Sequence, residues 1–190
     1  MRKEELWESL ALLCQKREDR HKLLAFVHQN PKSIAVLMEM IFLEEKEYGL
    51  LVGWSMDLVI QEDLYVILPF LDDFCQGIPS LRNQSAIRTM SKICATLMEF
   101  YYHKKDPKVI RSMKVEYRKI IAEVSFDWLL GEHKVAAKVF SMSSLYELGK
   151  EFDWIHPELE IILQRGYASG SVGYRSRARK VLERLSSTSV

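Results

Sequence analysis

The chain has 190 residues, a net charge of +1, 48% hydrophobic residues and 28% charged residues. This composition is ordinary for a globular protein with a substantial core. Eight glycines and five prolines are too few for a fold of many strands and turns, so the composition excludes that class and favours an all-helical protein.

The small net charge conceals an uneven distribution along the chain. From Glu39 to Asp73 there are nine acids and one base, whereas from Arg82 to Lys119 there are ten bases and three acids. From Arg165 to Arg184 there are six bases and one acid. Such asymmetry hints at a polar partner, although in helical proteins it is often only a solvated face.

Three features predict a cytoplasmic protein without a membrane segment or a metal site. Cys14, Cys75 and Cys94 are odd in number, widely spaced and set in apolar contexts, which indicates buried thiols in a reducing compartment. The charged N-terminus lacks the apolar run of a signal peptide. The most apolar stretch, Ile34 to Leu43, is too short to cross a bilayer and contains Glu39.

Apolar periodicity predicts a series of helices in the first half of the chain. Their expected ranges are 3–16, 18–28, 34–43, 47–62, 64–76 and 82–103. Asp63 is expected to cap the fifth helix, and Pro69 is expected to kink it or to mark a boundary. The segment from Gly77 to Ser80 reads as a break before the long sixth helix.

The second half continues with helices at 108–130, 134–150, from 157 onward and at 174–185, followed by a frayed tail at 186–190. The helix at 134–150 is expected to need neighbours on both sides. Its predicted buried face carries Val135, Val139, Met142, Leu145, Tyr146 and Leu148. Small residues fill the remainder, and Gly149 is expected to end the helix in a left-handed conformation.

The second helices of successive pairs start near residues 47, 84, 133 and 174, at spacings of about 37, 49 and 41 residues. Helical repeats of ~40–47 residues are typical of HEAT and armadillo units. The sequence therefore predicts an all-α, right-handed α-α superhelix of about five helix pairs, formed as one domain over residues 1–185. An unrelated helical bundle is the alternative.

The stretch from Ala136 to Leu185 resembles the end of small bacterial HEAT-like proteins. The most specific features are SRARK at 176–180, and Tyr146-Glu-Leu ahead of Pro157-Glu-Leu. Those proteins are similar to the DNA alkylation repair glycosylases, HEAT solenoids that read a DNA backbone in a basic concave groove. Some relatives are classed as adenylosuccinate lyases, but the chain lacks the Met-Pro pair and the Asn of the lyase loop at Gly170-Ser-Val-Gly-Tyr-Arg-Ser-Arg.

The resemblance to the glycosylases directs attention to Trp54 and Asp57. That family has a Trp-Asp-Leu-Val-Asp motif on a groove-facing helix, where this chain reads Trp54-Ser-Met-Asp57-Leu-Val-Ile60. An aromatic face and a carboxylate suit a cationic damaged base and the developing positive charge of its sugar. Because Ile60 replaces the last acid, Trp54 is better read as an aromatic of the core or of the groove wall.

Bases on the last helix and on the second helices of earlier pairs form the other candidate binding set. They comprise Arg88, Lys92, Lys138, Arg175, Arg177 and Lys180. Residues 177, 180 and 184 share one helical face, and residues 175 and 179 share another. In a solenoid these side chains would either solvate the outer surface or hold phosphates in the concave groove.

No motif for a catalytic site, a metal or a cofactor appears in the chain, so neither a cofactor nor catalytic residues are expected. The leading interpretation is a non-enzymatic module that binds a protein partner in a concave groove. The alternative is a nucleic-acid-binding relative of the alkylation repair proteins, without an intact glycosylase site. A lyase activity is disfavoured.

Overall fold

The computed structural model describes residues 3–14, 20–43 and 49–188, and every regular element in these ranges is a helix. This confirms the predicted all-α class. The chain divides into two compact units, residues 1–90 and 91–190, so that the boundary falls inside one helix. The two units are described separately, and the single domain over residues 1–185 stays a prediction.

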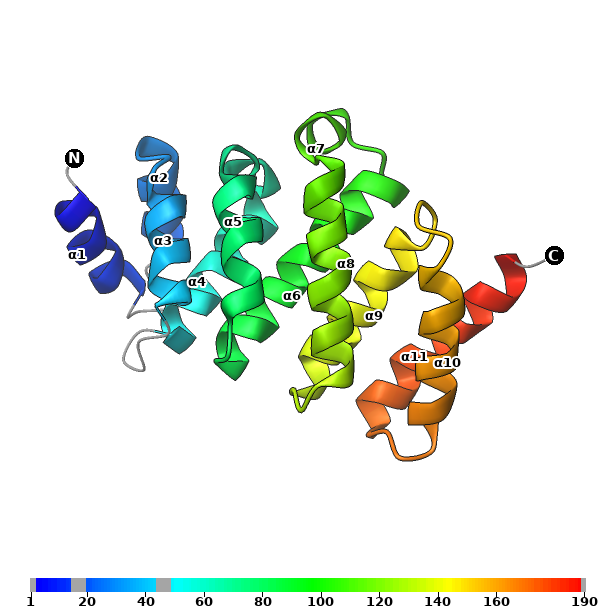
Figure 1. Ribbon diagram of the computed structural model, residues 1–190. Coiled ribbons are helices and arrows are strands. Elements are labelled where there is room, and N and C mark those ends of the chain that lie inside the picture. The colour runs from blue at the N-terminus through cyan, green and yellow to red at the C-terminus, as the bar shows by residue number, and fades with distance from the viewer. Residues whose placement is uncertain (1–2, 15–19, 44–48, 189–190) are drawn as a thin grey trace. The chain divides into compact units, whose positions relative to one another are not determined.

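The N-terminal unit is built around a helix that is apolar on nearly all sides. Its elements are α1 (Lys3–Cys14), α2 (Arg20–Gln29), α3 (Ser33–Phe42), α4 (Gly49–Glu62), the 3-10 segment η2 (Leu64–Phe70), α5 (Leu71–Gly77), the 3-10 turn η3 (Ile78–Ser80) and the first part of α6 (Gln84–Met98) (Figure 1). Seven of the ten residues of α3 are buried, and α3 packs against α1, α4 and η2.

The predicted helix at 64–76 is divided at Pro69. Residues Leu64–Phe70 form the 3-10 segment η2, and the α-helix α5 starts only at Leu71. Proline has no N–H to donate to the preceding turn, which explains the boundary. Asp63 caps this segment as expected, since its carboxylate accepts a hydrogen bond from the Tyr65 N–H at 2.9 Å.

Several predicted helix ends lie outside the described residues, namely residues 15–16, 18–19, 47–48 and 189–190. Three of the acids counted in the acidic stretch, Glu44, Glu45 and Glu47, lie there as well. The predicted burial of the cysteines is confirmed, because Cys14, Cys75 and Cys94 are all buried thiols. Burial raises the pKa of Cys75 to about 12, so this thiol stays protonated at neutral pH.

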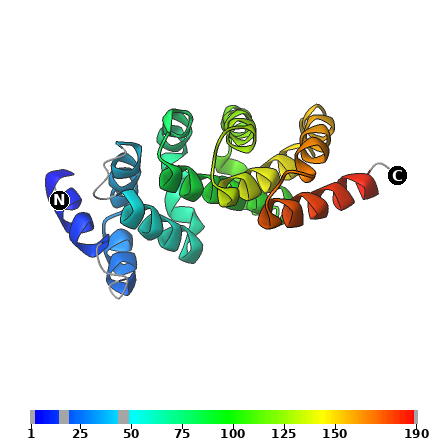
Figure 2. The ribbon, with the colours of Figure 1, turned by 90° about the horizontal axis from the view of Figure 1, so that it is seen from below.

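The C-terminal unit holds its helices in two layers. It consists of the end of α6, the π-helical segment η4 (Glu99–His103), α7 (Pro107–Ser112), α8 (Val115–Leu130), α9 (Val135–Leu148), α10 (Ile155–Tyr167) and α11 (Val172–Thr188). Helices α8 and α10 lie in one layer and α9 and α11 in the other (Figure 2). This arrangement brings α9 against α8, α10, α11 and η4.

Several predicted boundaries in this unit differ from the structure. The helix expected from Pro157 onward begins at Ile155, and the last helix begins at Val172 rather than at 174. The helix expected at 108–130 is interrupted at Met113 and Lys114, where the backbone leaves the helical region. Met113 is buried and its carbonyl accepts a hydrogen bond from Arg118 at 2.5 Å, so a side chain satisfies this carbonyl where the helix is broken. The last helix continues to Thr188, and residues 186–188 are therefore helical rather than a tail.

Helix α9 is buried through both small and large residues. Its buried positions are Ala137, Ser141, Met142, Ser144, Leu145 and Leu148. Part of the predicted apolar face is wrong, because Val135 is 37% exposed and Val139 and Tyr146 are only partly buried. Small side chains let the backbones of packed helices approach closely, which is why they, and not the valines, face the neighbouring helices.

Gly149 ends α9 for a different reason from the one expected. Its φ of −65° is right-handed, so the predicted left-handed ending is wrong. A Cβ at this position would overlap the imidazole ring of His156. That ring donates a hydrogen bond from Nε2 to the carbonyl of Tyr146 at 2.8 Å. The missing side chain of Gly149 thus makes room for a contact that closes the end of the helix.

A buried arginine links three segments of the C-terminal unit. Arg118 on α8 donates to the Glu151 carboxylate from Nε at 2.9 Å and from Nη2 at 2.7 Å. Tyr102 of η4 donates its hydroxyl to the same carboxylate at 2.5 Å. The Arg118 guanidinium also lies 4.6 Å from the ring centroid of Tyr101. The network fixes the π-helical segment against α8 and the turn after α9.

These contacts shift the pKa values of the groups involved. Burial alone favours the neutral form of Glu151, but the hydrogen bonds from Arg118 and Tyr102 outweigh it and lower the pKa of the carboxyl. Burial also opposes the charge on Arg118, yet the hydrogen bonds and charge of Glu151 raise the pKa of the guanidinium. Burial, followed by the hydrogen bond to Glu151, raises the pKa of Tyr102.

Replacing Arg118 with Ala is expected to destabilise the protein by about 1–3 kcal/mol. The reason is that the buried Met113 carbonyl and the Glu151 carboxylate would lose the hydrogen bonds that Arg118 donates to them. The free energy of unfolding in urea measures the effect. Lys119→Ala changes the exposed neighbour on the same helix and is expected to stay within about 0.5 kcal/mol of wild type. Equal losses in the two variants would contradict a structural role for the network.

The network also predicts a pH dependence of stability. Because folding lowers the pKa of Glu151 below its ordinary value of 4.5, its contribution is present at neutral pH and is lost as pH falls through the folded-state pKa. Glu151→Gln is expected to be less stable at neutral pH and to show a flatter decline in stability between about pH 5 and pH 3. Thermal melts across this range test it, and parallel declines in both proteins would refute it.

Candidate functional site

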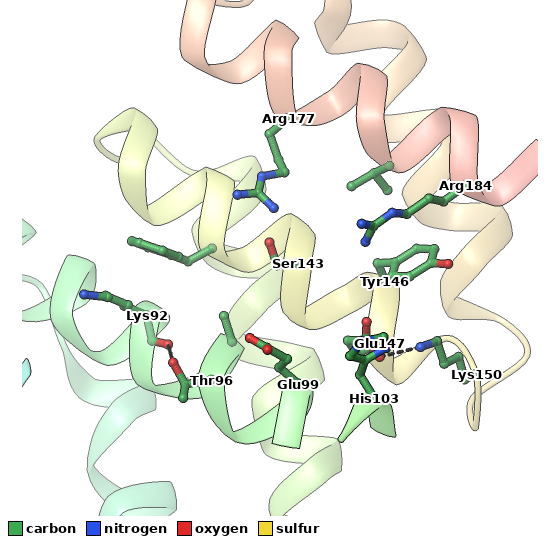
Figure 3. A pocket seen from close by; sticks show the side chains of 13 residues that line it. Lys92, Thr96, Glu99, His103, Ser143, Tyr146, Glu147, Lys150, Arg177 and Arg184 are labelled. Carbon is green, nitrogen blue, oxygen red and sulfur yellow. Dashed lines mark hydrogen bonds and ion pairs between the residues drawn. The ribbon is translucent and has the colours of Figure 1, made fainter. Parts of the chain in front are cut away.

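The C-terminal unit carries an open groove of about 660 Å³. One wall is formed by the end of α6 and by η4, the floor by α9 and the other wall by α11 (Figure 3). The lining residues are Lys92, Ala95, Thr96, Glu99, His103, Phe140, Ser143, Tyr146, Glu147, Lys150, Arg177, Val181 and Arg184. Helical spacing explains the floor, because residues 140, 143, 147 and 150 recur at steps of three and four.

Positive charge exceeds negative charge along the groove. Its two carboxylates each have a lysine partner: Glu147 lies 2.5 Å from the Lys150 ammonium, and Glu99 lies 3.4 Å from that of Lys104. The other cations of the lining are Lys92, Arg177 and Arg184. An anion that enters the groove would therefore meet a net positive surface.

Tyr146 forms an aromatic surface at one end of the groove. Its ring packs on the His156 imidazole, with centroids 5.6 Å apart. The guanidinium of Arg184 lies 5.5 Å from the ring centroid and the Lys150 ammonium 5.3 Å from it. Cations at these distances are attracted by the ring quadrupole, which orders their side chains beside the groove.

The π-helical turn η4 places its side chains on two sides. Glu99 and His103 line the groove, whereas Tyr101 and Tyr102 contact Arg118 and Glu151. Single π-helical turns change the register of side chains relative to the preceding α-helix and are frequent at functional sites. The buried network therefore anchors the wall that presents Glu99 and His103.

Helix α11 presents a narrow stripe to the groove. Arg177, Val181 and Arg184 line it at i, i+4 and i+7, while Ala178 and Leu185 are buried beneath. In Figure 3 the two arginine side chains project from α11 toward Ser143 and Tyr146. Arg177 is partly buried, and it has no hydrogen-bond or ion-pair partner within the described ranges.

The structure brings two of the predicted binding residues, Lys92 and Arg177, to this groove. Arg175 and Lys180 are exposed on α11 and do not line it. The face predicted from residues 177, 180 and 184 thus contributes its first and last members. Val181, rather than Lys180, lies between them.

The other candidates lie elsewhere. Lys138 lines a second, shallower hollow of about 510 Å³, together with His133, Arg165 and the loop at 169–171. Arg88 is exposed on the part of α6 that belongs to the N-terminal unit, and Trp54 and Asp57 are partly buried on α4. A shared glycosylase-like role for Trp54 and Asp57 stays a prediction.

Glycines shape one side of the second hollow. Cβ atoms at Gly166 and Gly170 would overlap the ring or hydroxyl of Tyr174. Tyr174 is buried there, and burial raises the pKa of its hydroxyl. Because the two glycines have no side chains, the Tyr174 ring can lie directly against their backbone and form that side of the hollow.

The sequence assigned no groove role to Glu99, His103, Tyr146 or Lys150. It did place Arg184 on the same helical face as Arg177, and the structure brings both side chains to the groove. No local sequence pattern predicts that η4 directs the side chains of Glu99 and His103 toward the groove, because a π-helical turn depends on the packing around it.

No group of three or more His, Cys, Asp or Glu side chains suitable for a metal ion occurs in the described ranges. Within the same ranges no helix has the length and apolar character needed to cross a bilayer. No protein-family profile, curated protein or solved structure matches the chain.

Proposed function

We propose that this protein is a non-enzymatic interaction module that binds a segment of a partner protein in the groove between η4, α9 and α11. The main support for this proposal is Arg177, a partly buried cation on the groove wall that has no partner in the described ranges. Arginine and tyrosine are enriched among the residues that dominate binding energies at protein interfaces. Arg177, Arg184 and Tyr146 are the expected anchors.

We also propose that the helices follow a HEAT-like scheme of about five pairs, in line with the resemblance of residues 136–185 to small bacterial HEAT-like proteins. The two layers of the C-terminal unit, with α8 and α10 in one and α9 and α11 in the other, support this proposal. In such repeats the second helices line the binding surface, and here α6, α9 and α11 line the groove together with η4.

Binding of nucleic acid is the second candidate function. It is supported by α11, where Arg175, Arg179 and Lys180 are exposed in addition to the two groove arginines. Two carboxylates in the groove argue against it, because Glu99 and Glu147 would lie close to a phosphate backbone. Glu147 in particular is held in place by Lys150 and has a side chain only 12% exposed.

A photoreactive amino acid at position 143 tests the protein-binding proposal. Ser143 lies on the groove floor, and its hydroxyl donates to the Val139 carbonyl of its own helix, so its replacement is expected to leave the fold intact. Irradiation in a lysate of the source cells is expected to give one discrete adduct that mass spectrometry identifies. The purified partner should then bind, and Arg177→Glu should weaken that binding.

The matched control carries the same photoreactive group at Glu123, which is exposed on α8 and does not line the groove. It is expected to give no such adduct. The same adduct from both positions, or none from position 143, would contradict binding in the groove.

Titration of labelled duplex DNA by fluorescence anisotropy separates the two candidates. At about 0.15 M salt we expect no binding tighter than the nonspecific range of ~10⁻⁴–10⁻⁶ M. Tight binding that falls steeply with salt, and that Arg175→Glu and Lys180→Glu weaken as much as Arg177→Glu, would instead favour the nucleic-acid function.

A further inference from the structure

We propose that the partner segment bound in this groove is an acidic peptide, held by the carboxylates of its Asp or Glu side chains against Arg177 and Arg184. This inference rests on the proposed function and specifies the chemistry of the partner. It follows from the balance of charges on the groove lining and from the geometry of α11.

A ligand in the groove would meet more positive than negative charge. Lys150 and Lys104 already face Glu147 and Glu99, so the two carboxylates of the groove are matched by two ammonium groups. The two arginines of α11 add further positive charge to the lining. Arg177 is partly withdrawn from water and has no partner in the described part of the chain. An ion pair between an incoming anion and this guanidinium is therefore stronger than one at a fully hydrated surface.

The spacing of the two arginines on α11 suits two acids of one peptide. Arg177 and Arg184 lie seven residues apart on one face of α11, which separates their backbones by about 10 Å at 1.5 Å per residue. In a peptide of polyproline II conformation, which has three residues per turn and a rise of ~3.1 Å per residue, two carboxylates three residues apart lie on one face and span about 9 Å. One such peptide along α11 can therefore engage both guanidinium groups in bidentate fashion.

The lining of the groove also has apolar parts. Val181 lies between the two arginines along α11, and Phe140 and Tyr146 of α9 belong to the same lining. An aliphatic side chain placed between two acids of the peptide would lie against these groups and exclude water from the ion pairs. The expected motif is thus acidic, with an apolar residue between acids.

Phosphorylated peptides are the competing class of ligand. A phosphate group carries about −1.5 to −2 charges at neutral pH, and arginine binds it in the same bidentate fashion as a carboxylate. A phosphoserine peptide therefore belongs in the test as the alternative to the glutamate peptide.

The test uses three fluorescein-labelled peptides of about twelve residues. The first carries glutamates at every third position with leucines between them, the second has glutamine at each glutamate position, and the third has phosphoserine there. Binding to the full chain is measured by fluorescence anisotropy at two salt concentrations. The glutamate peptide is expected to bind at least about tenfold more tightly than the glutamine peptide and to weaken as salt rises.

Charge-reversal variants locate the binding. Arg177→Glu and Arg184→Glu are each expected to weaken the binding of the glutamate peptide at least about tenfold. Arg175→Glu makes the same change in charge on the same helix outside the groove, and it is expected to change the affinity less than about twofold. Circular dichroism melts of all three variants check that they fold.

The outcomes distinguish this inference from the proposed function. Equal binding of the glutamate and glutamine peptides, tighter binding of the phosphoserine peptide, or equal losses in Arg175→Glu and Arg177→Glu would each overturn the acidic-peptide inference. If no peptide binds while a photoreactive group at position 143 still captures an identified partner, the inference fails and the proposed function stands. If both experiments fail, both proposals fall.

Discussion

The C-terminal unit depends on the burial of α9 among its neighbours. This helix packs against α8, α10, α11 and η4. It buries the large Met142, Leu145 and Leu148 together with Ala137, Ser141 and Ser144, which are small enough for close approach. The Ser141 hydroxyl has no hydrogen-bond partner in the described part of the chain. Leaving a buried hydroxyl unpaired costs about 1–3 kcal/mol, so close packing around α9 has to offset a polar penalty as well as the loss of chain entropy.

The groove is the part of α9 that its neighbours leave uncovered. With one side of the helix packed on α8 and α10, its residues 140, 143 and 147 remain between η4 and α11, together with Lys150 of the turn that follows. The contacts at the end of α9 fix this surface: the His156 imidazole fills the space left by Gly149, donates to the Tyr146 carbonyl and packs on the Tyr146 ring. The same interactions that end the helix thus orient the aromatic surface of the groove.

The ion pairs divide into buried and surface sets with different consequences. Arg118 and Glu151 are joined by two hydrogen bonds and shielded from water, with side chains 10% and 30% exposed, and they tie η4 to α8 and to the turn after α9. The ion pairs at the groove, Lys150 with Glu147 and Lys104 with Glu99, each involve a lysine side chain that is 36% or 46% exposed, and they contribute little to stability. Their effect is on recognition. The lysines neutralise the acids, so the arginines of α11 make the net charge of the groove positive.

The sequence by itself determined the helical class, most helix positions, the cap at Asp63, the boundary at Pro69 and the burial of the cysteines. Each follows from periodicity or from the chemistry of one residue, which act over a few positions of the chain. Lys92 and Arg177 were also among the predicted binding residues. Only the tertiary structure decided the break at Met113, the π-helical turn of η4, the right-handed Gly149 and the union of Tyr146, Arg184 and Glu99 in one groove. These features arise from contacts between segments far apart in sequence, such as Arg118 with Glu151 and α9 with α11, and such contacts leave no local pattern in the chain.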